Sequence, residues 1–379
     1  MTQAGGLNRT AGLKRSGFGR ALLRWYDSSR RDLPWRESND FYRVWISEVM
    51  LQQTRVEAVI PYYRRFLERF PSVESLATAS EDTVLTAWSG LGYYSRARNL
   101  HRAAKQLATQ NLPATYSEVL SLPGAGPYTA AAVASIALDL PYAAVDGNVI
   151  RVISRLTNDA SEIASVAARR RFTGEAGALL DPRRPGDFNQ AMMELGATIC
   201  LPRAPDCGAC PVGKFCAARA AGTERELPVK LKKQKARDVP LDLALIEAGI
   251  PEGAGLPEGD RRIFLVKRSS SERRLADFWE LPGRRLVHGP RGKLLAEFSH
   301  RIVNDRFRIR LFQIELSRIE LSRIEPSRAL IAGTPLARLP PGNWFGVAEL
   351  NEIPLTTITK KALAAAFSTV SILRPNREV

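Results

Sequence analysis

The fold is decided by the stretch Leu122-Pro123-Gly124-Ala125-Gly126-Pro127-Tyr128-Thr129-Ala130. Gly124 and Gly126 allow a tight backbone turn, which leaves free amides just before the N-terminus of a helix. Such amides can bind a phosphate group without reading any base. A plain turn between two helices is the simpler interpretation, and this stretch alone leaves both open.

On either side of this turn, the sequence up to residue 227 has the spacing of helices. Apolar residues recur three and four positions apart, and short breakers such as Phe70-Pro71-Ser72 and Ser89-Gly90 separate the segments. The pattern predicts a helical first domain over residues 1–227. The clearest helical segments are 41–51, 84–109, 127–138, 149–156 and 188–199.

The residue composition and its pattern change after this domain. Residues 228–240 open with a basic run that contains no acid, and they are predicted to form a linker. Beyond them, β-branched and aromatic residues alternate with polar ones, which predicts a second domain of the α+β type over residues 241–374. The whole chain is therefore expected to be a two-domain α + β protein. The predicted strands are 241–248, 263–267 and 306–316.

Two features stand out in this second domain. In residues 306–311 the arginines alternate with apolar residues and share one strand face, which is either solvated or laid against DNA. A motif that starts with Ile314-Glu315-Leu316-Ser317-Arg318 recurs every five residues through Arg328. We interpret it as a local duplication in a strand or surface loop, because the period fits neither a solenoid nor a heptad.

Composition narrows the function class. The 379 residues carry a formal net charge of +16 and the pI is about 10.1, which indicates a polyanion such as nucleic acid as partner. A basic protein that binds nothing is the alternative. No apolar run reaches the roughly 18 residues of a membrane helix, so no membrane contact is expected.

The first 26 residues contain no acid, and we interpret them as an unstructured basic arm rather than an organelle transit peptide. There is no secretory apolar segment. We therefore expect a reducing compartment, the cytoplasm, with the bacterial nucleoid as the site of action.

The four cysteines lie together at Cys200, Cys207, Cys210 and Cys216, and no thiol occurs elsewhere. Four soft thiolates so close in sequence can ligate one metal centre. Chance clustering and a zinc site are the alternatives, but zinc ribbons present two separated Cys-x2-Cys pairs and this chain has one. The spacing resembles that of the endonuclease III superfamily, which implies a [4Fe–4S] cluster that is structural and lies close to DNA.

Two carboxylates stand out upstream of the cysteines. Asp146 opens a predicted helix, where N-cap amides would hold it ionised, the state that stabilises a cationic sugar. Glu48 interrupts an apolar run and shares its helix face with Trp45 and Gln52. A half-buried Glu48 would have a raised pKa and could donate a proton. The plainer interpretations are an N-cap for Asp146 and a solvated position for Glu48.

Longer stretches resemble the adenine DNA glycosylase (MutY) family of the same helix-hairpin-helix superfamily. They are Trp45–Thr54, Gly90–Tyr94 and Phe188–Gly196, and with the cysteines the similarity spans residues 34–216. The resemblance implies a monomeric repair enzyme that flips adenine, mispaired with 8-oxoguanine or guanine, out of double-stranded DNA and hydrolyses its N-glycosidic bond. Another mismatch or damage glycosylase of the superfamily, and a noncatalytic damage-binding protein, remain alternatives.

The resemblance also assigns roles. Glu48 would protonate adenine and then activate water, Asp146 would stabilise the sugar cation, and Tyr128 and Asn148 would position these groups. Relatives that also cut the strand carry a lysine where Tyr128 stands, so a monofunctional enzyme is implied. The residues implied to contact DNA or adenine are Trp35, Arg36, Gln53, Thr54, Leu91, Tyr93, Gly124, Gly126 and Gln190.

The second domain resembles the family's Nudix-like module at Phe278-Trp279-Glu280-Leu281-Pro282-Gly283. Residues 284–297 hold one acid, Glu297, whereas Nudix hydrolases need a glutamate-rich metal site, so this domain is expected to bind and not to hydrolyse. Phe298-Ser299-His300 resembles the loop that inspects oxidised guanine. The short interval between the two motifs departs from the family pattern.

Overall fold

The computed structural model describes residues 15–229, 237–248, 262–272, 275–287, 292–302, 304–314 and 339–367. The chain forms two compact units. The first comprises Met1–Thr78 and Ser95–Lys232, and the second comprises Ala79–Tyr94 and Lys233–Val379. A short segment from the helical part of the sequence thus belongs to the second unit.

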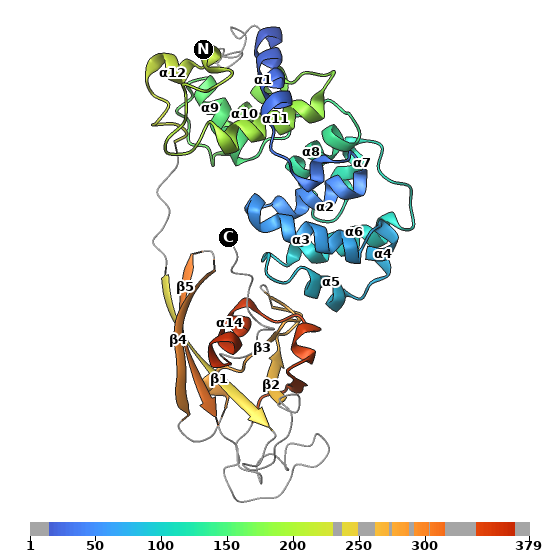
Figure 1. The fold of residues 1–379 in the computed structure, drawn as a ribbon, viewed down its shortest axis with the longest axis vertical. Coiled ribbons are helices and arrows are strands. Elements are labelled where there is room, and N and C mark those ends of the chain that lie inside the picture. The colour runs from blue at the N-terminus through green and yellow to red at the C-terminus, as the bar shows by residue number, and fades with distance from the viewer. Residues whose placement is uncertain are drawn as a thin grey trace, which may run out of the picture. The chain divides into compact units, whose positions relative to one another are not determined.

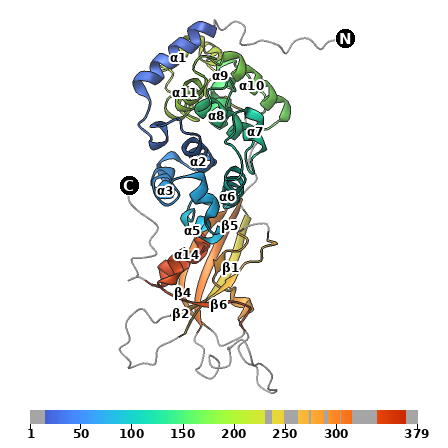
Figure 2. The ribbon, with the colours of Figure 1, turned by 90° about the vertical axis from the view of Figure 1, so that its right-hand side faces the viewer.

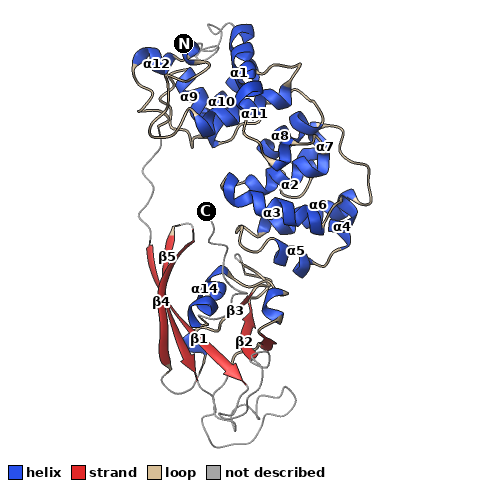
Figure 3. Ribbon diagram, in the orientation of Figure 1, coloured by secondary structure: helices blue, strands red, loops and turns tan. Residues whose placement is uncertain are grey.

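Helices make up the regular structure described in the first unit (Figures 1 and 3). No helix in the described part of the chain has the length and apolar character needed to span a membrane. The helices are α1 (Arg15–Ser29), η2 (Pro34–Arg36), α2 (Phe41–Leu51), α3 (Val56–Arg69), α4 (Val73–Thr78), α6 (Ser95–Leu107), α7 (Tyr116–Ser121), α8 (Pro127–Ala137), α9 (Gly147–Leu156), α10 (Val166–Leu179), α11 (Pro185–Thr198), η3 (Gly213–Phe215) and α12 (Ala217–Ala221).

The turn that contains Gly124 and Gly126 joins α7 to α8. Thr115 and Glu118 form a capping box at the start of α7. Gly124 has a φ of 81° and packs so closely on Asn99 that a Cβ there would lie 2.6 Å from the Asn99 Cβ. Only glycine meets both demands without strain. The two helices and their glycine turn are therefore a helical hairpin, as the sequence predicts.

The core of the first unit forms where α1, α9, α10 and α11 meet. Its largest buried side chains include Tyr26, Phe18, Phe172 and Phe188. Cys200, Cys210 and Cys216 pack against the edge of this same cluster. The cysteine loop is thereby fastened to α9 and α11, the helices that also carry Asn148 and Gln190.

The predicted segment 84–109 is two helices and not one. α5 (Glu81–Ala87) belongs to the second unit and α6 to the first. Gly90 and Gly92 between them have φ values of 115° and 72°. A continuous right-handed helix cannot pass through such residues.

The second unit contains a mixed sheet with the strand order β3-β2-β1-β5-β4, and β6 pairs with β2. β1 runs parallel to β5, while the β1–β2, β2–β3, β2–β6 and β4–β5 pairs are antiparallel. Leu243, Ile309 and Leu363 are buried in one core between the sheet and α14 (Figure 2). The elements after the linker are β1 (Arg237–Ala248), β2 (Arg262–Lys267), β3 (Trp279–Glu280), η5 (Arg284–Leu286), β4 (Lys293–Ile302), β5 (Asp305–Ile314), β6 (Asn343–Gly346), η6 (Glu349–Asn351) and α14 (Thr357–Ala366).

Strand boundaries differ from the sequence-based ones at two places. β1 begins at Arg237, four residues before the predicted start of the domain, because residues 237–240 pair with 305–308 of β5. β5 ends at Ile314. The remainder of the five-residue repeat, residues 315–328, lies outside the described residues.

The arginines of β5 form ion pairs with β1. Arg306 and Arg308 both bind Asp238, and Arg310 binds Asp242, with N–O distances of 2.6 Å. The parallel register places Asp238 opposite Arg306 and Asp242 opposite Arg310. The arginine side chains stay at least half exposed, so this strand face is partly neutralised by its own sheet and remains open to solvent or to DNA.

Candidate active site

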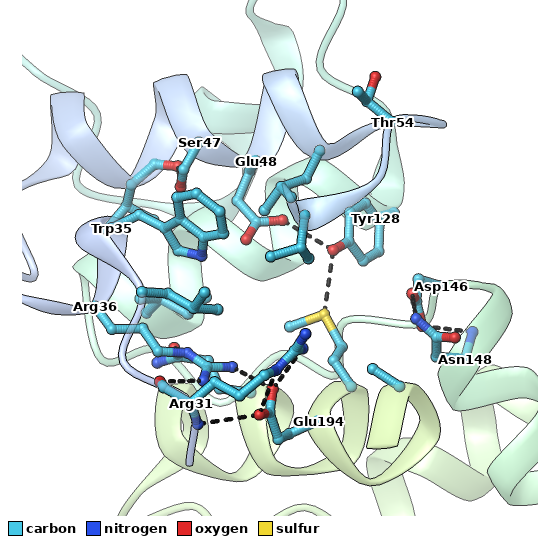
Figure 4. A pocket seen from close by; sticks show the side chains of 18 residues that line it. Arg31, Trp35, Arg36, Ser47, Glu48, Thr54, Tyr128, Asp146, Asn148 and Glu194 are labelled. Carbon is cyan, nitrogen blue, oxygen red and sulfur yellow. Dashed lines mark hydrogen bonds and ion pairs between the residues drawn. The ribbon is translucent and has the colours of Figure 1, made fainter. Parts of the chain in front are cut away.

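A cavity of about 160 Å³ lies between the helices of the first unit (Figure 4). Its walls come from η2, α2, α8, α11 and the start of α9. It brings together eight side chains that sequence analysis selected from positions far apart in the chain. They are Trp35, Arg36, Glu48, Thr54, Tyr128, Asp146, Asn148 and Gln190.

Glu48 lies on the inner face of α2 and is only 4% exposed, so it is buried more deeply than predicted. The Tyr128 hydroxyl donates a hydrogen bond of 2.8 Å to its Oε2 and also lies 3.2 Å from the Met193 sulfur. Burial raises the pKa of Glu48 to about 7, although the Tyr128 hydrogen bond opposes the rise. The predicted rise in pKa is confirmed, and this carboxyl can carry a proton near neutral pH.

Asp146 is the N-cap of α9. Its Oδ1 accepts hydrogen bonds from the Asn148 and Val149 amides at 2.9 and 2.7 Å, and its Oδ2 accepts one from the Asn148 side chain at 2.9 Å. Burial nevertheless raises the pKa of Asp146 above its usual value, and these bonds only oppose the rise. The cap amides favour the ionised carboxylate, as the sequence predicts, but desolvation outweighs them in the net shift of the pKa.

Asn148 is itself held in place. Its Oδ1 accepts a hydrogen bond of 2.8 Å from Arg151, which also donates to the Gly196 carbonyl at 2.7 Å. Gly196 packs against the Asn148 Cβ so closely that a Cβ at residue 196 would lie 2.6 Å away. The orientation of Asn148, and through it that of Asp146, is fixed by α11.

The floor of the cavity is an ion-pair network that sequence analysis missed. Glu194 is buried and accepts hydrogen bonds from the side chains of Arg31 and Arg36 at 2.8 to 2.9 Å. Burial alone would raise the pKa of Glu194, but the two arginines outweigh it and lower the pKa to about 2. Arg36 also donates to Gln190 at 3.2 Å. The only sequence signal for Glu194 was an acid inside the apolar run 191–195.

Other predicted residues do not line this cavity. Gln53 follows α2 with a φ of 57°, in a loop held by the Arg96 guanidinium, which donates to the Gln52 carbonyl at 2.5 Å. Gly124 and Gly126 lie in the hairpin turn. Leu91 and Tyr93 belong to the segment assigned to the second unit, where Leu91 is buried and Tyr93 is 49% exposed.

Ser299 and His300 lie inside β4, not in a loop. Alternation along the strand places them on opposite faces. Ser299 is exposed opposite Arg308, whereas His300 is half-buried opposite Phe307, and burial together with the charge of Lys361 lowers its pKa. The loop implied by the resemblance is therefore a strand here, and it presents the two side chains on opposite faces.

The four cysteines line a single cavity together with Arg155. Arg155 donates to the Cys200 sulfur at 3.2 Å and to the Leu201 carbonyl at 2.8 Å. Among the described residues, no group of three or more His, Cys, Asp or Glu side chains is arranged to hold a single metal ion.

Residues 46–173 match the family described as "HhH-GPD superfamily base excision DNA repair protein". The HhH-GPD segment contains Glu48, Tyr128, Asp146 and Asn148. The cysteine loop and the strands of the second unit follow it.

Whole proteins similar to this chain include the adenine DNA glycosylase of Rattus norvegicus, 49% identical over 53% of this chain and 41% of that protein. The Arabidopsis thaliana adenine DNA glycosylase is 38% identical over 69% of this chain and 46% of that protein. The chain thus spans less than half the length of these relatives. A solved thermostable thymine-DNA glycosylase is 28% identical, with a TM-score of 0.49, over 56% of this chain and 99% of that one.

Proposed function

We propose that this chain is a monofunctional DNA glycosylase that hydrolyses the N-glycosidic bond of adenine mispaired with 8-oxoguanine or guanine. The observation that carries the proposal is one cavity that holds both Glu48, with a pKa of about 7, and Asp146. Cleavage of an N-glycosidic bond needs an acid for the leaving base and an anion for the cationic sugar. The adenine DNA glycosylases among its relatives support adenine as that base.

In the proposed reaction, protonated Glu48 donates its proton to a ring nitrogen of the flipped adenine. The electron pair of the N-glycosidic bond leaves with the base, and the sugar becomes cationic. The Asp146 carboxylate stabilises this cation. The Asn148 side chain holds that carboxylate in place. Glu48, now ionised, takes a proton from water as the water oxygen bonds to the sugar carbon.

Tyr128 supports the monofunctional assignment. Strand cleavage through a Schiff base needs an amine, and the described residues that line the cavity include no lysine. The Tyr128 hydroxyl instead bonds to Glu48 and supports its orientation. We expect abasic sites to stay uncut, and efficient strand cleavage with a borohydride-trapped complex would contradict this assignment.

We infer that Cys200, Cys207, Cys210 and Cys216 hold a [4Fe–4S] cluster. A single zinc ion would gather four sulfurs at about 2.3 Å, whereas a cluster spreads its four ligands more widely. Four thiols that line one cavity match the ligand set of such a cluster. When bound, the cluster would hold the cysteine loop together. Arg155 links this loop to α9. Freshly purified protein should absorb in the visible range, and one zinc with no iron would contradict the inference.

The deciding assay for the function is base release from duplexes that pair A, T, C or G with 8-oxoguanine or with guanine. Release of adenine alone, faster opposite 8-oxoguanine, is the expected result. Release of thymine instead would show another mismatch glycosylase of the superfamily. Tight binding without release of any base would show a noncatalytic damage-binding protein.

A further inference from the structure

The segment Ala79–Tyr94 has an unusual position, because it precedes most of the first unit in sequence but belongs to the second. It consists of α5 and the loop 88–94. Gly90, Gly92 and Tyr93 all have left-handed backbone conformations, with φ values of 115°, 72° and 49°. Tyr93 is the costly one, since a left-handed residue with a large side chain is strained by about 1–2 kcal/mol. The loop must be held by its surroundings.

Part of that support is internal. The Trp88 indole donates to the Gly92 carbonyl at 3.2 Å, and the Gly90 amide donates to the Tyr94 hydroxyl at 3.3 Å. Leu91 is buried, whereas about half of the Tyr93 side chain remains exposed. The loop therefore presents one aromatic ring outward and turns its other large side chains inward.

The remaining support comes from residues near the far end of the chain. The Lys360 ammonium on α14 donates a hydrogen bond of 2.7 Å to the Ser89 hydroxyl. The Phe278 ring is fully buried and packs on Tyr94, with ring centroids 4.1 Å apart. Thr86 at the end of α5 donates to the Glu352 carbonyl at 3.3 Å.

The hydrogen bond from Lys360 to Ser89 is the most informative of these contacts. It is half-buried, and burial lowers its pKa. Placing an ammonium group where solvation is poor is unfavourable unless the group makes a directed hydrogen bond. Its bond to Ser89, at the first turn of the loop, is therefore well suited to fix where the loop leaves α5.

We propose that Lys360 and Phe278 are positioning residues for the loop that presents Tyr93, so that the second unit acts on DNA through this loop as well as through its sheet. The proposal rests on the proposed function and on the resemblance to the adenine DNA glycosylase family, which implies that Tyr93 contacts DNA or adenine. It assigns to α14 a part in substrate recognition without any contact of its own to the base.

The test compares Lys360→Met with Lys361→Met in the full-length protein. Both variants remove one ammonium from the same helix, but Lys361 is exposed, and the hydrogen bond to Ser89 comes from Lys360. Hydrogen exchange of the amides in residues 88–94 reports the loop directly, without DNA. We expect about tenfold faster exchange in Lys360→Met, as the loss of a charge-assisted hydrogen bond implies, and no change in Lys361→Met.

Ser89→Ala gives a second route that leaves α14 intact. If the Lys360–Ser89 bond carries the effect, the double variant Lys360→Met/Ser89→Ala should be no worse than either single one. The same variants should weaken binding to a duplex with 8-oxoguanine opposite an abasic-site analogue by about tenfold, while the rate of the chemical step at saturation changes less.

Two results would overturn the proposal: unchanged loop exchange in Lys360→Met, or equal effects of the Lys360 and Lys361 changes. Failure of the proposed function is distinguishable, because a wild-type protein that released no adenine would still show whether Lys360 orders the loop.

Discussion

The cavity between the helices of the first unit and strand β4 place the predicted site residues in opposite ways. The cavity gathers Glu48, Tyr128 and Asp146 from three helices onto one shared space, although they are far apart in sequence. β4 separates Ser299 from His300 although they are adjacent. Helices packed together can converge their side chains, whereas a strand alternates its own. Sequence proximity is therefore a poor guide to shared function in the second unit.

The largest expected effect comes from Glu48→Gln. The substitution keeps the shape of the side chain but removes the proton donor. Base release under single-turnover conditions should fall at least 10⁴-fold, the upper range for general acid catalysis, while affinity for the duplex stays nearly unchanged. Tyr128→Phe is the matched control, since it removes the hydrogen bond to Glu48 but keeps the acid. A near-normal rate in Glu48→Gln would remove the cavity from the mechanism.

Asp146→Asn should cost somewhat less, about 10²–10³-fold in the same assay, because it removes the anion that faces the cationic sugar. The amide can still cap α9 by accepting from the backbone amides of Asn148 and Val149. Unfolding by denaturant should therefore change little. A loss of activity that followed a loss of stability would reduce Asp146 to a helix cap.

The raised pKa of Glu48 predicts a pH-dependent stability. The folded pKa of about 7 lies above the usual value of 4.5, so folding favours the protonated form. The stability that protonation contributes is complete below pH 4.5 and is lost as the pH rises through 7, by about 3 kcal/mol. Glu48→Gln should lack this loss and become more stable than the wild type at pH 8 relative to pH 4. Equal pH profiles in denaturant unfolding would show that Glu48 is solvated.

The smallest expected effects lie in β4. Ser299→Ala removes an exposed hydroxyl and should reduce the preference for 8-oxoguanine over guanine by about 1–3 kcal/mol, the usual range for a base contact. His300→Ala lies on the other face and should lower stability without changing that ratio. The comparison is the ratio of rates and affinities on the two duplexes. A changed ratio in His300→Ala alone would reverse the assignment of the two faces.

Deletion of residues 229–379 tests whether the second domain as a whole carries the preference for 8-oxoguanine over guanine. The truncated protein should keep slow adenine excision and lose much of its preference for 8-oxoguanine. Because the segment 79–94 would also lose its packing partners, Lys360→Met helps to separate loss of the sheet from loss of loop support.

Local signals made much of this protein readable from its sequence. Helical spacing located α2, α8, α9 and α11 to within a few residues, and the glycines of 122–130 located the hairpin. The cysteine spacing pointed to one site, and all four cysteines do line one cavity. An acid in an apolar run was enough to select Glu48 and to predict its raised pKa. These features depend on residues near each other in the chain, so they can be predicted from the sequence directly.

Tertiary structure alone decided the rest. Arg31 and Glu194 are bonded across 163 residues, and no local pattern links them. Burial outweighed the cap amides at Asp146, and only packing sets how much water is excluded. The break at Gly90 was visible in the sequence, but the assignment of residues 79–94 to the second unit was not, because this segment contacts Phe278 and Lys360, which lie far along the chain. Such contacts form only once the chain has folded, since their energy depends on distance in space and not along the sequence.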